Sequence, residues 1–198
     1  MAYFRSVTLL AGLIGVAALA MAGSAGAAGW DLEANVRDPS YAVSEPTSTD
    51  LNIDTVVLSC EQGPERRGLQ LRLYLSGTGP LAPKAAAAAL KDDPRVELVV
   101  DGVSQPAGLL FADDFVVVAD AADGTMPLLS NTFLDRLQAG RRLELKFDLV
   151  QESRGQAPSF DGSAVVDLLA GAGSRAVKVV RRCADEPSQH LAETPRGR

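Results

Sequence analysis

The feature that most limits the fold of this chain is the alternation of apolar and polar residues in two stretches, 69–75 and 141–150. The apolar positions are Leu69, Leu71, Leu73 and Leu75 in the first stretch, and Leu143, Leu145, Phe147 and Leu149 in the second. Because successive side chains of a β-strand point to opposite faces, each stretch turns its apolar residues to one side of a sheet. One polar face is typical of antiparallel sheets.

The remaining apolar segments complete a mainly β domain. Strands are predicted at 52–60, 95–100, 115–119 and 163–169, and Asp101-Gly102 is the dipeptide favoured in tight hairpins. Pro106 and Gly108 are expected to interrupt the strand that returns from this hairpin, and 120–124 is expected to form a turn. The predicted fold is an antiparallel β-sandwich or a curled sheet with one or two short helices.

Three segments are candidate helices. Residues 130–139 are the clearest, because an apolar stripe runs through them, Thr132 and Asp135 have capping-box spacing, and Gly140 stands at the expected stop. The alanine-rich segment 84–91 predicts a short helix after Pro83. Residues 174–182 fit a short helix slightly better than a strand.

The first 27 residues have the three-part layout of a secretory signal peptide. Arg5 gives a basic start, residues 7–22 carry no charge, and Ala25 and Ala27 form an A-x-A cleavage site before Ala28. The alternative is a permanent membrane anchor, but the apolar run is shorter than the roughly 20 residues that span a bilayer. Cleavage predicts a periplasmic or secreted protein without a stable membrane anchor.

Composition divides the rest of the chain. Residues 28–50 are polar and predict an extended N-terminal segment, with Trp30 packed on the edge of the domain. Residues 51–183 form the predicted β-rich globular domain. Residues 184–198 have no apolar periodicity and predict a disordered tail.

The charge of the chain argues against nucleic acid as a partner. Its net charge is −6, and an acidic domain repels phosphate backbones. The basic pairs Arg66-Arg67, Arg141-Arg142 and Arg181-Arg182 are short and separated by acidic residues, so they are interpreted as solvated surface.

Cys60 and Cys183 are the two cysteines of the chain. In a reducing compartment they could be buried thiols, a nucleophile or a metal pair. After export an isolated pair most often forms one disulfide, which is the prediction here. A zinc site needs about four ligands, and the single histidine, His190, lies in the polar tail.

Acidic residues gather around the apolar segment 115–119, namely Asp113, Asp114, Asp120 and Asp123. Paired carboxylates could support acid–base catalysis or bind calcium, but their spacing does not match a calcium loop. Acidic residues also favour turns, so solvated turns with little effect on stability are predicted. The segment Gly171-Ala-Gly173-Ser-Arg-Ala176 matches G-x-G-x-x-A, and it is interpreted as a tight turn because the second half of a dinucleotide-binding unit is missing.

The succession of elements from Val96 onward, including NTFLDRLQAG, RRLELKFDL, FDGSAVVDLLAG and SRAVKVV, resembles the bacterial invasion-associated locus B family of exported proteins. The likeness covers Asn52 to Cys183. It implies a periplasmic or surface-associated sandwich without catalytic residues, and it assigns no functional residue.

The resulting hypothesis is an exported, non-enzymatic binding or interaction module whose protein or small-molecule partner is unknown and which needs no cofactor. The alternative is a hydrolase or metal-dependent enzyme that uses the acids of Asp113–Asp123.

Overall fold

The computed structural model describes residues 29–77, 79–81, 90–112, 114–150 and 159–185. The predicted signal peptide, the tail from residue 186 onward and positions 84–89 of the alanine-rich segment lie outside these ranges. Leu90 and Lys91, expected in a helix, belong instead to a strand. No helix among the described residues is long and apolar enough to cross a membrane.

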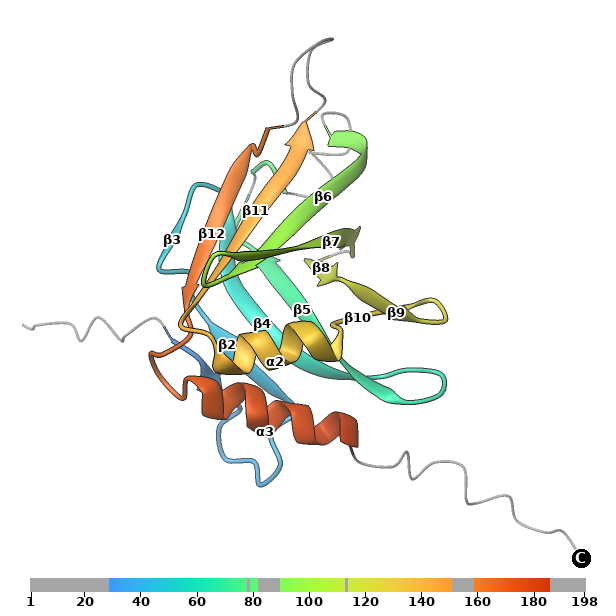
Figure 1. Ribbon diagram of the computed structural model, residues 1–198, viewed down its shortest axis with the longest axis vertical. Helices are drawn as coiled ribbons and strands as arrows, with labels where there is room; N and C mark the ends of the chain where they lie inside the picture. The colour runs from blue at the N-terminus through green and yellow to red at the C-terminus, as the bar shows by residue number, and fades with distance from the viewer. Residues whose placement is uncertain (1–28, 78, 82–89, 113, 151–158, 186–198) are drawn as a thin grey trace, which may run out of the picture.

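Ten strands of the described part form one antiparallel sheet that curls strongly on itself (Figure 1). They are β1 (Asp31–Leu32), β2 (Tyr41–Ser44), β3 (Ser48–Thr49), β4 (Ile53–Gln62), β5 (Arg67–Leu75), β6 (Leu90–Val100), β7 (Val103–Phe111), β8 (Phe115–Ala119), β11 (Arg142–Val150) and β12 (Gly162–Asp167). Their order across the sheet is β1-β2-β4-β5-β8-β7-β6-β11-β12-β3. The prediction of a mainly β, curled antiparallel sheet is confirmed.

The alternation seen in the sequence sets the two faces of the sheet. Leu71 pairs with Leu58 of β4 and Val118 of β8, and all three side chains are fully buried in the concave interior. On β11, Leu143, Leu145 and Phe147 fill the same interior. The polar residues between them face outward, so the two alternating stretches specify which side of the sheet becomes the core.

The β6–β7 hairpin turns at Asp101-Gly102, as predicted, with positive φ angles of 48° and 85°. The expected interruption of β7 is wrong, because the strand runs through both Pro106 and Gly108. Pro106 pairs with Glu97 of β6, whereas pairing with β8 starts at Gly108. That part of β7 has one neighbouring strand, and an open strand side tolerates the missing proline amide.

Helix α2 (Asn131–Ala139) buries Phe133, Leu134 and Leu137, which confirms the predicted helix. The predicted capping box is wrong, because Ser130 is the N-cap and its hydroxyl accepts a hydrogen bond from the Phe133 amide at 3.1 Å. The helix stops at Gly140, whose amide donates to the Arg136 carbonyl, although Gly140 has an extended rather than a left-handed conformation.

The second helix, α3 (Ser174–Asp185), settles the ambiguous segment 174–182 in favour of a helix that includes the first two positions of the expected tail. It buries Ala176, Val177 and Val180. Both helices lie across the lower end of the curled sheet in Figure 1, and α3 packs on α2 and on β4, β5 and β2.

The N-terminal segment is part of the domain rather than an appendage. It supplies β1, β2 and β3, and the expectation that Trp30 lies at the domain edge is wrong because its side chain has 0% exposure. Trp30 forms a parallel bridge with Gly171, which has a φ of 62° and leaves no room for a Cβ beside the Trp30 carbonyl. The G-x-G segment is therefore a tight turn, and the backbone of Trp30, just before β1, packs against its first glycine.

Candidate functional site

Three acids of the cluster around β8 are described and they do not converge on one site, because Asp114 is exposed and Asp120 and Asp123 have separate partners. Asp120 accepts a hydrogen bond from the Ser130 amide at 2.7 Å, and its second oxygen contacts the Ser130 hydroxyl and the Gln105 side-chain amide. Gln105 in turn accepts from Arg136 at 3.0 Å. Asp120 therefore fixes the N-cap of α2 to β7, and its interpretation as a solvated turn residue is wrong.

Asp123 has a separate environment. It lies in β9 (Ala121–Asp123), which forms a hairpin with β10 (Met126–Leu128), so only part of the expected 120–124 turn is a turn. Its carboxylate pairs with Arg66 at 3.3 Å, and the Arg66 side chain is 64% exposed. Asp113 lies outside the described residues, and no group of three or more potential metal ligands occurs among the described ones.

Replacing Asp120 with Ala is expected to lower the free energy of unfolding by about 2 kcal/mol, because three donors lose a charged acceptor. Replacing Asp123 with Ala is the matched control and should change stability by less than about 0.5 kcal/mol, because its partner is exposed. Urea denaturation followed by circular dichroism measures both values. Equal effects of the two substitutions would contradict the assignment of Asp120 to the α2 cap.

Cys60 and Cys183 are joined by a disulfide, with Cα atoms 6.2 Å apart, as the sequence predicts. The bond attaches the last turn of α3 to β4. The thiols are therefore not available as a nucleophile or as metal ligands, and the disulfide acts as a structural tether.

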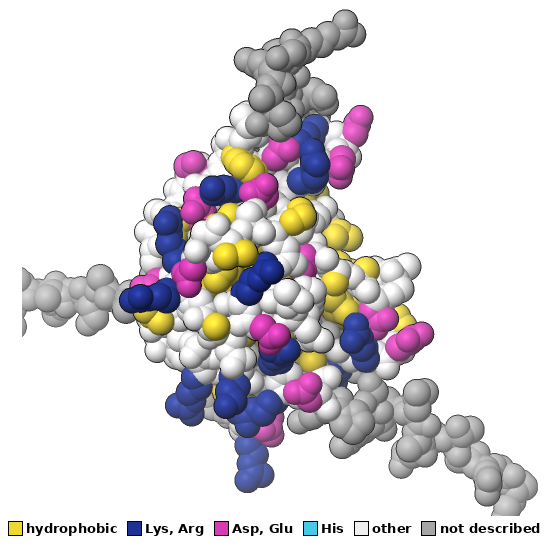
Figure 2. Space-filling view, viewed as in Figure 1, with side chains coloured by type: hydrophobic (Ala, Val, Ile, Leu, Met, Phe, Trp, Pro, Cys, Tyr) yellow, Lys and Arg dark blue, Asp and Glu magenta, His cyan; other side chains and the backbone are white. Residues whose placement is uncertain are grey.

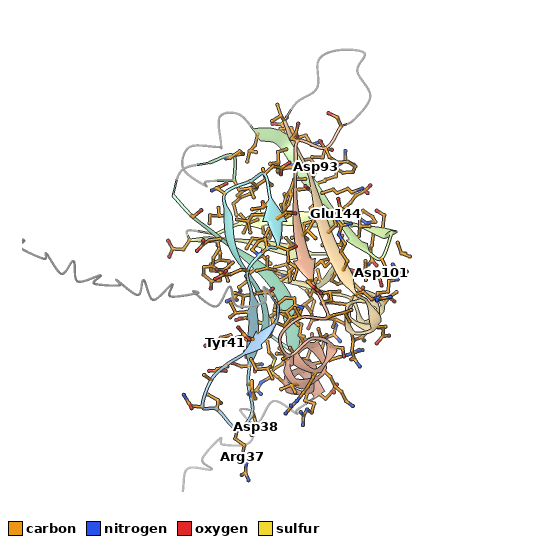
Figure 3. The ribbon with its side chains drawn as sticks, turned by 90° about the vertical axis from the view of Figure 1, so that its left-hand side faces the viewer. Arg37, Asp38, Tyr41, Asp93, Asp101 and Glu144 are labelled. Atoms are coloured by element: carbon orange, nitrogen blue, oxygen red, sulfur yellow. A yellow bond between two sulfur atoms is a disulfide. The ribbon has the colours of Figure 1, made fainter. Side chains whose placement is uncertain are left out.

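A candidate binding site is a groove of about 500 Å³ on the outward face of β2, β4 and β5. The register places Val43 beside Val57 and Val57 beside Arg72, while Thr55 lies beside Tyr74. Figure 3 shows Tyr41 on the same outward side of β2. The lining is Ser40, Tyr41, Val43, Asp54, Thr55, Val57, Ser59, Cys60, Glu61, Arg72 and Tyr74. Four of these side chains, Tyr41, Val43, Val57 and Tyr74, are apolar or aromatic, and apolar atoms form most of the groove surface.

A small set of charged and aromatic contacts shapes one side of the groove. The Arg72 guanidinium pairs with Glu61 at 2.8 Å and lies 4.7 Å from the centre of the Phe115 ring. Phe115 also packs on Tyr74, with ring centres 5.5 Å apart. Arg72 and Tyr74 are held by these contacts, so this side of the groove is largely preformed.

The floor of the groove contains a polar group without a partner. Ser59 lies between Tyr41 and Gln70 in the sheet and is only 6% exposed. Its hydroxyl makes no hydrogen bond to any residue that the structure describes. Buried polar groups are normally satisfied, so the Ser59 hydroxyl is a candidate hydrogen-bonding group for a ligand in the groove.

Sequence reasoning did not find this groove. Val57 and Tyr74 are single apolar or aromatic residues on the otherwise polar outward faces of β4 and β5, and the outward face of the short strand β2 consists of Tyr41 and Val43. The one available signal is that Tyr74 breaks the polar pattern of 69–75 with an aromatic side chain. Only the register of β2, β4 and β5 brings these residues together.

Comparison of the chain with protein-family models, with curated proteins and with solved structures gives no match.

Proposed function

We propose that this protein is an exported, non-enzymatic binding module that holds a small, largely apolar ligand in the groove over β2, β4 and β5. The groove carries the proposal: its volume of about 500 Å³ lies within the range of small-molecule sites, about 300–1,000 Å³. Such sites combine an apolar wall with a few polar groups that orient the ligand. Tyr41, Val43 and Val57 supply the wall, and the Ser59 hydroxyl and Arg72 supply the polar groups.

The separation of the described acids supports a binding role over catalysis. Asp120 serves the α2 cap and Asp123 pairs with Arg66, so neither presents a free carboxylate to a shared cleft. Within the groove, Arg72 and Glu61 form an ion pair, and Asp54 is a single exposed carboxylate rather than one of a pair. The alternative of a hydrolase or metal-dependent enzyme based on Asp113–Asp123 has no geometric support among these residues.

Two observations support export. The disulfide suits an oxidising compartment, and the apolar start of the chain matches a cleavable leader. The resemblance to the invasion-associated locus B family would place the protein in the periplasm or at the cell surface, and this assignment remains a proposal.

Titration with N-phenyl-1-naphthylamine, a neutral apolar fluorophore, tests the groove. We expect the fluorescence of the probe to rise on binding, and Val57→Asp to weaken its affinity about tenfold, because a charge then lies in the apolar wall. Val103→Asp is the matched control, since Val103 is an outward, 52% exposed residue of β7 away from the groove. A thermal melt establishes that both variants are folded. Equal affinity in Val57→Asp and wild type would refute this site.

A further inference from the structure

A second pocket, distinct in chemistry from the groove, lies between α3 and the loop that joins β1 to β2. Its volume is about 230 Å³. Arg37 and Asp38 come from the loop, Arg67 from the start of β5, and Arg182 from the last turn of α3. Figure 3 places Arg37 and Asp38 at the tip of this loop, beyond the end of the sheet. The remaining lining is Pro39, Ser40, Val179 and Cys183.

The backbone around this pocket is held firmly on both sides. The disulfide ties Cys183 to Cys60 of β4, and the Cys60 amide donates to the Ser40 carbonyl at 2.8 Å. Ser40 donates in addition from its amide and hydroxyl to Glu33 at 3.0 and 3.1 Å. The loop and the helix are thus positioned by contacts that do not use the arginine side chains lining the pocket.

The charges of the pocket are strongly unbalanced. Three arginines face one acid, Asp38, in a chain whose net charge is −6. Arg37 and Arg182 form no ion pair with any described residue, whereas Arg67 donates to the Gln62 side chain at 3.2 Å. The sequence separates Arg67 and Arg182 into two basic pairs interpreted as solvated surface, and the fold brings one member of each pair to the same pocket.

The surface around the pocket extends this positive charge. Arg175, Lys178 and Arg182 are exposed and lie at i, i+3 and i+7 on α3, which places them along one side of the helix. Figure 2 shows Lys and Arg side chains gathered over α3 at the lower end of the molecule. An anion that approaches this end meets a local positive potential despite the acidic composition of the chain.

We propose that this pocket binds a phosphate-type oxyanion through Arg37 and Arg182, with Arg67 as its third wall. A guanidinium presents a planar fork of donors that matches two oxygens of a phosphate, and such charge-assisted pairs are among the strongest hydrogen bonds in proteins. The phosphate group is either a free ion or small phosphate ester, or the headgroup of an anionic lipid. Ser40 lines both this pocket and the groove, but none of the three arginines lines the groove, so either proposal stands without the other.

Two probes separate these sources. Inorganic phosphate is titrated into the full-length mature protein at constant ionic strength, with binding followed by NMR at the amides of Arg37, Ser40 and Val179. Vesicles of phosphatidylcholine, with and without phosphatidylglycerol, are tested by co-sedimentation. We expect the double variant Arg37→Gln/Arg182→Gln to weaken binding of the responding probe by about tenfold or more, since two charged donors are lost.

The double variant Arg141→Gln/Arg142→Gln is the matched control, because it removes the same charge from exposed positions that line neither the pocket nor α3. Phosphate binding that weakens only in the pocket variant supports a soluble ligand. Phosphatidylglycerol-dependent sedimentation that weakens only in that variant, without phosphate binding, supports a lipid headgroup. An equal loss in both variants, or no binding of either probe by the wild-type protein, would overturn the proposal.

Discussion

The double substitution Cys60→Ser/Cys183→Ser is expected to lower the free energy of unfolding by about 4 kcal/mol. The disulfide joins residues separated by 123 positions, and constraining a loop of about 100 residues removes unfolded-state entropy worth about 4.7 kcal/mol in the chain-entropy model. A domain of this size loses about 2–4 °C in Tm per kcal/mol, so we expect a fall of roughly 10 °C. The buried residues of α3 should keep the domain folded at room temperature.

Calorimetry of the oxidised wild type, the reduced wild type and the double serine variant measures this effect, and the last two should agree.

Thiol titration of the denatured, unreduced protein from its native host should find no free thiol, and its intact mass should correspond to a chain that starts at Ala28. Two titratable thiols per molecule, or a bridge between chains, would rule out the intramolecular bond in the protein from its native host. A mass that includes residues 1–27 would rule out cleavage of the leader.

Replacing Trp30 with Ala is expected to cost about 3–5 kcal/mol of stability. Its side chain is fully buried, and removing a large buried aromatic side chain leaves a cavity that the surrounding core fills only in part. Trp30 also holds the start of β1 against Gly171, so its loss should loosen the contact between the N-terminal strand and the turn before α3.

Trp30→Phe is the control for this substitution. The indole nitrogen has no hydrogen-bond partner among the described residues, so phenylalanine loses volume but no hydrogen bond. We expect Trp30→Phe to retain more than half of the stability that Trp30→Ala loses, as measured by chemical denaturation. A Trp30→Ala variant within about 1 kcal/mol of wild type would show that the N-terminal segment contributes little to the core.

The sequence predicted those parts of the fold that depend on local pattern. Alternation identified β5 and β11, and the Asp101-Gly102 pair identified a hairpin. The errors arise where a distant part of the chain decides the outcome. Trp30 lies in a polar segment of the sequence. Its place in the core becomes clear only from the bridge to Gly171, which is near the other end of the chain. Pro106 does not interrupt β7, because β8 pairs with β7 only from Gly108 onward and the proline therefore has no partner strand on that side.

The candidate sites were harder to predict for the same reason. Asp120 resembles any acidic turn residue until the fold places Ser130 and Gln105 around its carboxylate. The groove depends on the register of three strands, and the arginine pocket joins a loop, a strand and the C-terminal helix. None of these combinations can be recognised from the sequence. A regular spacing of residues predicts which side chains share one face of a single helix or strand, but not which elements come together in the fold. The disulfide was predictable because the chain has two cysteines and one way to pair them within a molecule.

The attachment of α3 to β4 also sets the order of events when the chain is made. A polypeptide appears from its N-terminus, so Cys60 is present long before Cys183 and has no intramolecular partner until almost the whole domain has emerged. The bond can therefore form only after every strand of the sheet has been synthesised. Since one intramolecular pairing exists, maturation requires an oxidant but no enzyme that rearranges incorrect disulfides.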